Sequence, residues 1–145
     1  MSLDNLDKII IKIGSSLIIN EENAINDQFL DEISKDILSL EKKGIKTLIV
    51  SSGAIELGKI DLNKSKNKLN LSESQAASSI GQIKLINAWK IALKKFGLNA
   101  AQILITAEDT ENRKRFLNAR STIEELIEEK YIPCLLYTSP SPRDP

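Results

Sequence analysis

Short apolar runs alternate along the chain with longer segments of helical periodicity, and this alternation limits the possible folds more than any other feature. Runs rich in isoleucine, leucine and valine occupy residues 8–13, 45–50 and 100–106, and another begins at Tyr131. Nearly continuous apolar runs of this length are typical of strands buried on both faces. Strands that alternate with helices are joined by right-handed crossovers into a parallel sheet. The sequence therefore predicts an α/β fold, a three-layer αβα sandwich with a mainly parallel sheet.

Helical patterns fill the intervals between these runs. Asn26 and Asp27 can cap a helix that ends near the Lys42-Lys43-Gly44 sequence. Ser72 and Gln75 fit the capping box of a second and longer helix. A segment without apolar periodicity precedes this second helix, so we expect an exposed loop at residues 59–70.

Glycine inside the second helix is a feature that calls for an explanation. Gly81 costs about 1 kcal/mol relative to alanine at such a position, so it indicates close approach either to another backbone or to a ligand. We favour packing, because interior glycines usually have a packing reason. The helix stops near Gly97, and a third helical pattern covers residues 111–130 with a possible second start at Ser121.

Composition excludes several classes of function. The chain of 145 residues carries 20 Lys and Arg against 20 Asp and Glu, so its net charge gives no case for nucleic acid or an anionic membrane as a partner. No segment approaches the roughly 18 apolar residues of a membrane span, and we expect a cytoplasmic protein. One cysteine cannot form an intramolecular disulfide, and histidine is absent. Any chemistry must rest on Lys, Arg, Ser, Asp, Glu and backbone amides.

Small residues follow two of the predicted strands, in "KIGSS" at residues 12–16 and "VSSGA" at residues 50–54. Ligands of open parallel sheets bind beyond the carboxyl ends of the strands. Glycine and serine let backbone N–H groups approach an anion there, helix N-termini add a favourable dipole, and Lys12 adds a positive charge. The spacing matches neither a P-loop nor a dinucleotide fingerprint. The pattern thus predicts a phosphate or carboxylate site, while an ordinary tight turn with a solvent-directed lysine remains the alternative.

Four motifs narrow this reading, because "IIIKIGSSLI", "LIVSSGAIELG", "SQAASSIGQ" and "RFLNAR" occur in the order and approximate spacing of the glutamate 5-kinases. Over residues 8–133 the chain resembles this branch of the amino acid kinase family. The resemblance implies transfer of the γ-phosphoryl group of ATP to the side-chain carboxylate of glutamate, with ATP and Mg²⁺ as cofactors. The product is glutamyl 5-phosphate, and the reaction is the first step of proline biosynthesis.

The resemblance also implies roles for individual residues. Lys12 is similar to the catalytic lysine that contacts the transferring phosphate, and Gly14 with Ser15 to the backbone cradle beside it. The turn formed by Ser52, Gly53 and Ala54 is similar to the glutamate-binding turn. No residue is implied as a metal ligand.

A cluster of polar residues in the third helical segment has several possible roles. Arg113, Arg115, Asn118 and Arg120 could cap the glutamate side or join subunits. Structural roles are favoured, because charge on a helix more often forms a solvated face or an ion-pair network.

Partners and alternatives follow from the same resemblance. We expect glutamate as a small-molecule partner, neither nucleic acid nor a membrane, and self-association into a homo-oligomer in the full-length enzyme. Two other functions stay open: an amino acid kinase with another acceptor, and a non-catalytic module that binds a small anion or amino acid.

The end of the chain departs from the family pattern. All four prolines and the only cysteine lie between Pro133 and Pro145, where "CLLYTSPSPRDP" resembles translated sequencing-adapter sequence. We therefore expect residues 1–133 to be the N-terminal part of an amino acid kinase domain and residues 134–145 to be a non-native or disordered tail. Because much of the ATP site would be missing, we also expect the chain to be inactive alone.

Overall fold

The structure is a computed structural model that describes residues 8–65, 67–105 and 113–137. Helices and strands alternate along nearly all of the described chain, as the sequence predicts. In chain order the elements are β1 (Lys8–Ile13), α1 (Ser15–Ile18), α2 (Asp27–Lys42), β2 (Lys46–Ser51), α3 (Ala54–Asp61), α4 (Leu71–Lys94), β3 (Ala100–Ile105), α6 (Arg113–Glu128) and β4 (Ile132–Tyr137).

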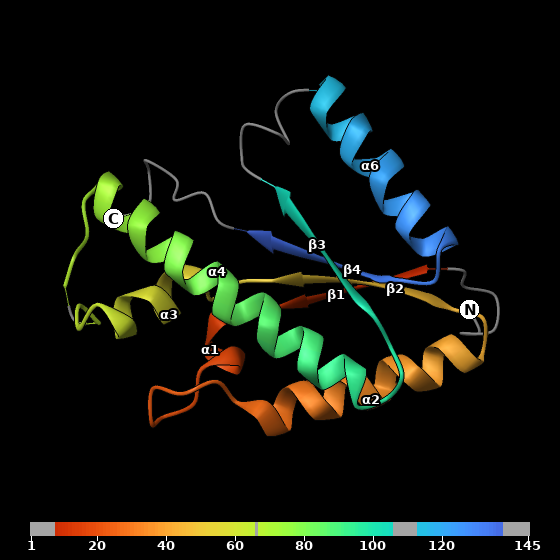
Figure 1. The fold of residues 1–145 in the computed structure, drawn as a ribbon, viewed down its shortest axis with the longest axis horizontal. Coiled ribbons are helices and arrows are strands. Elements are labelled where there is room, and N and C mark those ends of the chain that lie inside the picture. Colours follow the sequence, from red (N-terminus) through yellow and green to blue (C-terminus); the bar gives the residue numbers. More distant parts are fainter. Residues whose placement is uncertain (1–7, 66, 106–112, 138–145) are drawn as a thin grey trace.

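The four strands form one parallel sheet in the order β1-β2-β4-β3. Strand β1 pairs with β2 along its whole length, from Lys8 opposite Lys46 to Ile13 opposite Ser51. Strand β4 enters between β2 and β3 and pairs with both. Because all four strands run the same way, their carboxyl ends lie at one edge of the sheet (Figure 1). The predicted α/β fold with a parallel sheet is confirmed.

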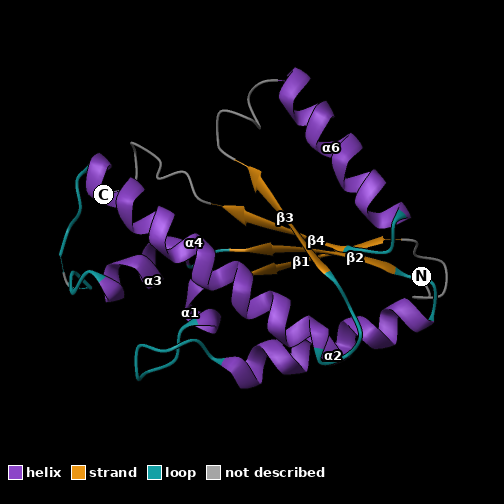
Figure 2. Cartoon of the chain, viewed as in Figure 1, coloured by secondary structure: helices purple, strands orange, loops and turns teal. Residues whose placement is uncertain are grey.

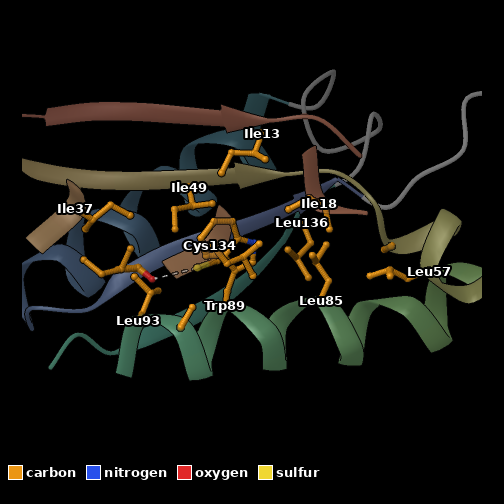
Figure 3. Close-up of a cluster of buried hydrophobic side chains, with 14 residues drawn as sticks. Ile13, Ile18, Ile37, Ile49, Leu57, Leu85, Trp89, Leu93, Cys134 and Leu136 are labelled. Carbon is orange, nitrogen blue, oxygen red and sulfur yellow. Dashed lines mark hydrogen bonds between the residues drawn. The ribbon is translucent and has the colours of Figure 1, made fainter. Parts of the chain in front are cut away.

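Helices lie on both sides of the sheet, with α6 on one side and the other helices on the opposite side (Figure 2). The main core forms between the sheet and helices α2 and α4, where buried isoleucine and leucine side chains from the sheet and from both helices meet (Figure 3). The strands contribute Ile13, Ile49, Ile132, Cys134 and Leu136, and the two helices contribute Leu30, Ile37, Leu85, Trp89, Ala92 and Leu93.

Helix α2 begins and ends where the sequence predicts. The side chain of Asn26 accepts a hydrogen bond from the Phe29 N–H at 3.2 Å, which satisfies one of the unpaired donors of the first turn. After Lys42 the chain turns at Gly44, whose φ of 79° lies in the left-handed region that glycine adopts without strain. These two ends fix the entry of the chain into β2.

The cap of helix α4 corrects the sequence-based expectation. Its capping box is formed by Asn70 and Glu73: the Asn70 side chain accepts from the Glu73 N–H at 2.8 Å, and the Glu73 carboxylate accepts from the Asn70 N–H at 3.1 Å. Ser72 lies within the first turn and does not cap it. Asparagine caps as well as serine does, and glutamate three residues later completes the pattern.

Three further details differ from expectation. The predicted loop at residues 59–70 begins later, because α3 extends to Asp61. Helix α6 runs through Ser121 without a second start. Strand β1 is not buried on both faces, since Lys8, Ile10 and Lys12 alternate as exposed residues with more buried neighbours. The nearly continuous apolar run predicted a strand buried on both faces, but only one face of β1 is covered.

Strand β4 crosses the boundary that the sequence predicts between the kinase segment and the tail, after Pro133. The strand continues to Tyr137, and Cys134, Leu135 and Leu136 are buried between β2 and β3. The boundary therefore falls inside a central strand, because three consecutive apolar side chains there fill both faces of the sheet. Residues 138–145 lie outside the described residues, and the origin of the tail stays a prediction.

The side of the sheet that carries α6 is only partly covered. A groove of about 420 Å³ runs between β1, β2 and α6, and its walls are mainly apolar, including Ile10, Leu48, Ile123 and Ile127. Ile10 is 61% exposed. Among the described residues, no helix is long and apolar enough to cross a membrane.

Candidate functional site

The two loops that the sequence singles out meet at the carboxyl edge of the sheet. Ile13 and Ser51 are opposite one another at the ends of β1 and β2, and the Ser52 N–H donates a hydrogen bond to the Ile13 carbonyl at 3.0 Å. The chain therefore leaves both strands side by side. This contact brings Gly14 and Ser15 next to the turn that begins at Ser52.

The first loop presents a charge and an open backbone. Lys12 is exposed on the same face of β1 as Lys8 and Ile10, and no ion pair among the described residues involves its ammonium group. Gly14 is also exposed, and nothing lies within 4 Å of the position that a Cβ would take there. Ser15 opens the short helix α1 directly after it. The loop thus offers a cation and an accessible backbone segment to an anion.

The second loop is a tight turn held against the core. Gly53 has a φ of 117°, in the region that side-chain-bearing residues rarely adopt, and a Cβ there would lie 3.4 Å from the Ile18 side chain. Ala54, which begins α3, is buried, and Ser52 is half-buried. The turn therefore has little room to change its conformation.

Helix α4 fixes the start of α3 by direct backbone contact. A Cβ at Gly81 would overlap the Ala54 carbonyl, and a Cβ at Gly58 would overlap the Ala77 carbonyl. The contact is reciprocal, because each helix places a glycine against the backbone of an alanine four residues before the partner's glycine. Gly81 thus has the packing role that the sequence favours, and through Ala54 it also fixes the candidate turn.

A cavity of about 270 Å³ with several polar residues in its wall lies beside the first loop. Ser15 and Ser16 of α1 form part of its wall, and Glu56 and Lys59 of α3 form another part. Lys12 and the turn at residues 52–54 do not line this cavity. Ser16, Glu56 and Lys59 are polar residues near the site that the sequence did not single out, and no helix was predicted from the sequence at residues 54–61.

The polar cluster of helix α6 is only partly described. The side chains of Arg113 and Arg115 lie outside the described part, and Asn118 is exposed. Arg120 pairs with Glu124 at 3.3 Å, and both side chains are more than half exposed. Such a pair on a helix surface contributes a few tenths of a kcal/mol. Arg120 also lines the groove beside Ile10 rather than the candidate turn, which favours a structural role for it.

A buried pair of residues beneath the turn was missed by the sequence reading. Trp89 of α4 donates a hydrogen bond from Nε1 to Ser51 Oγ at 3.2 Å, and both residues are fully buried. The signal that could have found it is a single tryptophan on the apolar face of a helix, because a buried indole N–H requires an acceptor.

Two titratable groups outside the candidate loops have shifted pKa values. Burial raises the pKa of the Cys134 thiol to about 12, so the thiol stays protonated at neutral pH and is a poor nucleophile. At the start of α4, the hydrogen bond from Lys64 lowers the pKa of Glu73, which keeps the capping carboxylate ionised. Neither group belongs to the candidate site.

The fold and the paired loops define an α/β protein with a candidate anion site at the carboxyl edge of its sheet. Residues 7–136 match the model of the amino acid kinase family, and the chain belongs to that family. It is 44% identical over 134 residues to the glutamate 5-kinase of Rhizobium rhizogenes, covering 92% of this chain and 34% of the relative. It is 42% identical over 133 residues to the glutamate 5-kinase of Brucella ovis, covering 92% of this chain and 35% of the relative. The chain therefore spans about a third of the length of these curated relatives.

Proposed function

We propose that the chain carries part of an ATP-dependent glutamate kinase, which transfers the γ-phosphoryl group of ATP to the side-chain carboxylate of glutamate. The main structural support is the hydrogen bond between Ser52 and Ile13. It joins the first loop, which follows Lys12, to the tight turn at Gly53, and both lie at the carboxyl edge of the sheet. The names of relatives at 42% and 44% identity support the choice of glutamate as acceptor. The product, glutamyl 5-phosphate, would enter proline biosynthesis.

The reaction makes few demands on side-chain chemistry. A carboxylate oxygen of glutamate bonds to phosphorus while the bond to the bridging oxygen breaks, and ADP leaves with the electron pair. Glutamate has a side-chain pKa of about 4.3 and is already ionised at neutral pH, so no general base is needed. Catalysis then consists of positioning and charge stabilisation. A chain without histidine can supply both.

The first loop is suited to the phosphate. In the proposal, Lys12 places its ammonium group near the transferring phosphate and offsets the charge that develops there. Gly14 and Ser15 hold the phosphate oxygens through backbone N–H groups, for which the open space at Gly14 leaves room. The exposure of Lys12 and its freedom from ion pairs among the described residues are consistent with this role.

The second loop is suited to the amino acid. Ser52 offers a hydroxyl group, and Gly53 and Ala54 offer backbone N–H groups at the start of α3, where the helix dipole favours a negative charge. The packing of Ala54 against Gly81 fixes the helical end of the turn before a ligand arrives. A preformed turn loses little entropy on binding.

Other parts of the proposal rest on the family alone. Mg²⁺ would neutralise the phosphates, and we assign it no ligand, since the described residues contain no cluster of three or more His, Cys, Asp or Glu side chains that could hold a metal. Self-association and a cytoplasmic location stay predictions of the same kind.

A chimera tests the proposal directly. The matched segment of the Rhizobium rhizogenes relative is replaced by the corresponding segment of this chain, and formation of acyl phosphate from glutamate and ATP is measured by trapping with hydroxylamine. We expect the chimera to be active, and Lys12→Ala to lower its kcat/KM by a factor of about 10², the scale of losing one preorganised stabilising group. The 145-residue chain alone is expected to give no turnover above background.

Lys8→Ala is the matched control, because Lys8 is exposed on the same face of the same strand but lies at its opposite end. It is expected to leave kcat/KM unchanged. Equal losses in the two variants, or none in Lys12→Ala, would remove Lys12 from the mechanism. An inactive chimera that is folded would argue against the glutamate kinase assignment.

A further inference from the structure

A tryptophan in the core is connected to the candidate glutamate turn by two hydrogen bonds. Trp89 Nε1 donates to Ser51 Oγ at 3.2 Å, and Ser51 Oγ donates to the Ser52 carbonyl at 3.2 Å. The indole group can only donate, whereas a hydroxyl can accept and donate at once. The two contacts are therefore compatible in this direction, and they link α4 to the backbone of the turn.

These bonds fix the orientation of one peptide group. In a trans peptide the N–H points opposite to the C=O. Because the Ser52 carbonyl is turned toward the buried Ser51 hydroxyl, the Gly53 N–H is turned away from it. The peptide groups on either side have backbone partners, since the Ser52 N–H donates to Ile13 and the Gly53 carbonyl accepts from the Leu57 N–H, each at 3.0 Å. The peptide between Ser52 and Gly53 is held instead by a side chain.

The conformation of Gly53 makes this restraint important. Its φ of 117° and ψ of −6° belong to a region in which glycine has alternatives of similar energy. A flip of the preceding peptide would exchange the positions of the Ser52 carbonyl and the Gly53 N–H. A carbonyl oxygen facing the ligand would repel a carboxylate, whereas an N–H group attracts it.

We propose that Ser51 and Trp89 are positioning residues that hold the Gly53 N–H toward the ligand. They touch no ligand themselves and act through the backbone of the turn. The ligand half of this inference rests on the proposed function, whereas the orientation of the turn does not. The chain contains one tryptophan, so its indole N–H gives a single signal that reports on the contact.

The first measurement needs no ligand. Proton–nitrogen correlation spectra are recorded for the chain and for Ser51→Ala, together with hydrogen-exchange rates of the Trp89 indole and the Gly53 amide. We expect Ser51→Ala to shift both signals and to raise the exchange rate of the Trp89 indole about tenfold, the scale of losing one buried hydrogen bond. Trp89→Phe, which keeps an aromatic ring but removes the donor, should shift the Gly53 amide in the same direction.

Ser34→Ala is the matched control. Ser34 is also a fully buried serine, and its hydroxyl donates to the Leu30 carbonyl at 2.8 Å within α2. It should leave the Gly53 and Trp89 signals in place. If Gly53 is unchanged in Ser51→Ala, or changes equally in Ser34→Ala, the positioning role is wrong and the contact only stabilises the core.

The second measurement adds glutamate to the same samples. We expect glutamate to shift the Gly53 amide and its apparent Kd to rise about tenfold in Ser51→Ala but not in Ser34→Ala, the loss expected for a hydrogen bond to a charged group. Equal affinities of the chain and Ser51→Ala would overturn the ligand half. If glutamate shifts no signal of the unaltered chain, the glutamate assignment fails for this chain, while the first measurement still decides whether Ser51 orients the turn.

Discussion

The two faces of the sheet differ sharply in what covers them. On the face toward α2 and α4, Ile49 is completely buried and belongs to a continuous core. On the opposite face Ile10 is 61% exposed, and an apolar groove separates β1 and β2 from α6. Stability is thus concentrated on one face. The proposed chemistry uses both, because the turn is fixed from the covered face and Lys12 lies on the other.

Adjacent residues of β2 give the largest expected contrast between the faces. Ile49→Ala removes a fully buried side chain from the core and should lower the free energy of unfolding by about 2–5 kcal/mol. Leu48→Ala, one residue earlier, faces the groove and is half-buried, so we expect a loss of about 1 kcal/mol. Urea denaturation of both variants measures the difference. Similar losses would show that the groove face is as tightly packed as the core.

The crossing of α3 and α4 gives the next largest effect. Gly81→Ala places a methyl group where the Ala54 carbonyl lies, so the helices must separate, and overpacking of this kind costs about 1–3 kcal/mol. Gly14→Ala is the comparison, since its Cβ meets open space and its φ of −79° suits alanine. Thermal denaturation should separate the two variants. If Gly81→Ala is as stable as the unaltered chain, the close contact does not limit the crossing.

The order of elements could be predicted because local signals and tertiary packing agree. Asn26 caps the start of α2 as its sequence position indicates, and Gly44 lies in the turn that follows the end of the helix. The coverage of β1 could not be predicted, because Ile9, Ile10 and Ile11 are alike in sequence and only the placement of the helices distinguishes them. Burial depends on contacts between segments that are distant in the chain, and a short apolar run does not encode which face is covered.

The candidate site likewise has one part that local sequence signals predict and another that depends on tertiary packing. Lys12 and the turn at residues 52–54 could be singled out from glycine, serine and lysine at strand ends, and the structure brings their loops together. Their roles stay predictions. The contact between Trp89 and Ser51 could not be predicted, because it joins residues 38 positions apart that carry no shared motif. Such support depends on the packing of α4 over the sheet.

The thiol of Cys134 offers a test of burial by pH. Burial on the covered face raises its pKa to about 12, whereas in the unfolded chain the pKa is about 8.5–9. The unfolded chain therefore loses this proton first, and the free energy of unfolding falls as pH rises above about 9. At pH 10 the loss should be about 1–2 kcal/mol relative to pH 8.

Cys134→Ala removes the titrating group and serves as the reference. Urea denaturation of both proteins under reducing conditions at pH 8, 9 and 10 gives the difference that belongs to the thiol. A difference between the proteins that does not change with pH would mean that the covered face admits water at β4.

The smallest expected effect is a gain in stability on the covered face. Thr47 is buried in β2, and its hydroxyl oxygen has no hydrogen-bond partner among the described residues. Thr47→Val keeps the β-branched shape and removes the unsatisfied group, so the free energy of unfolding should rise by about 1 kcal/mol.

The same substitution at Thr122 of α6 is the control, because that hydroxyl is exposed and donates to the Asn118 carbonyl at 3.0 Å. Thr122→Val should bring no gain, since valine is no better than threonine on an exposed helix surface. Urea denaturation of the two variants decides the point: a gain at both positions would assign the effect to valine itself, and a loss at Thr47 would mean that its hydroxyl has a partner in solution.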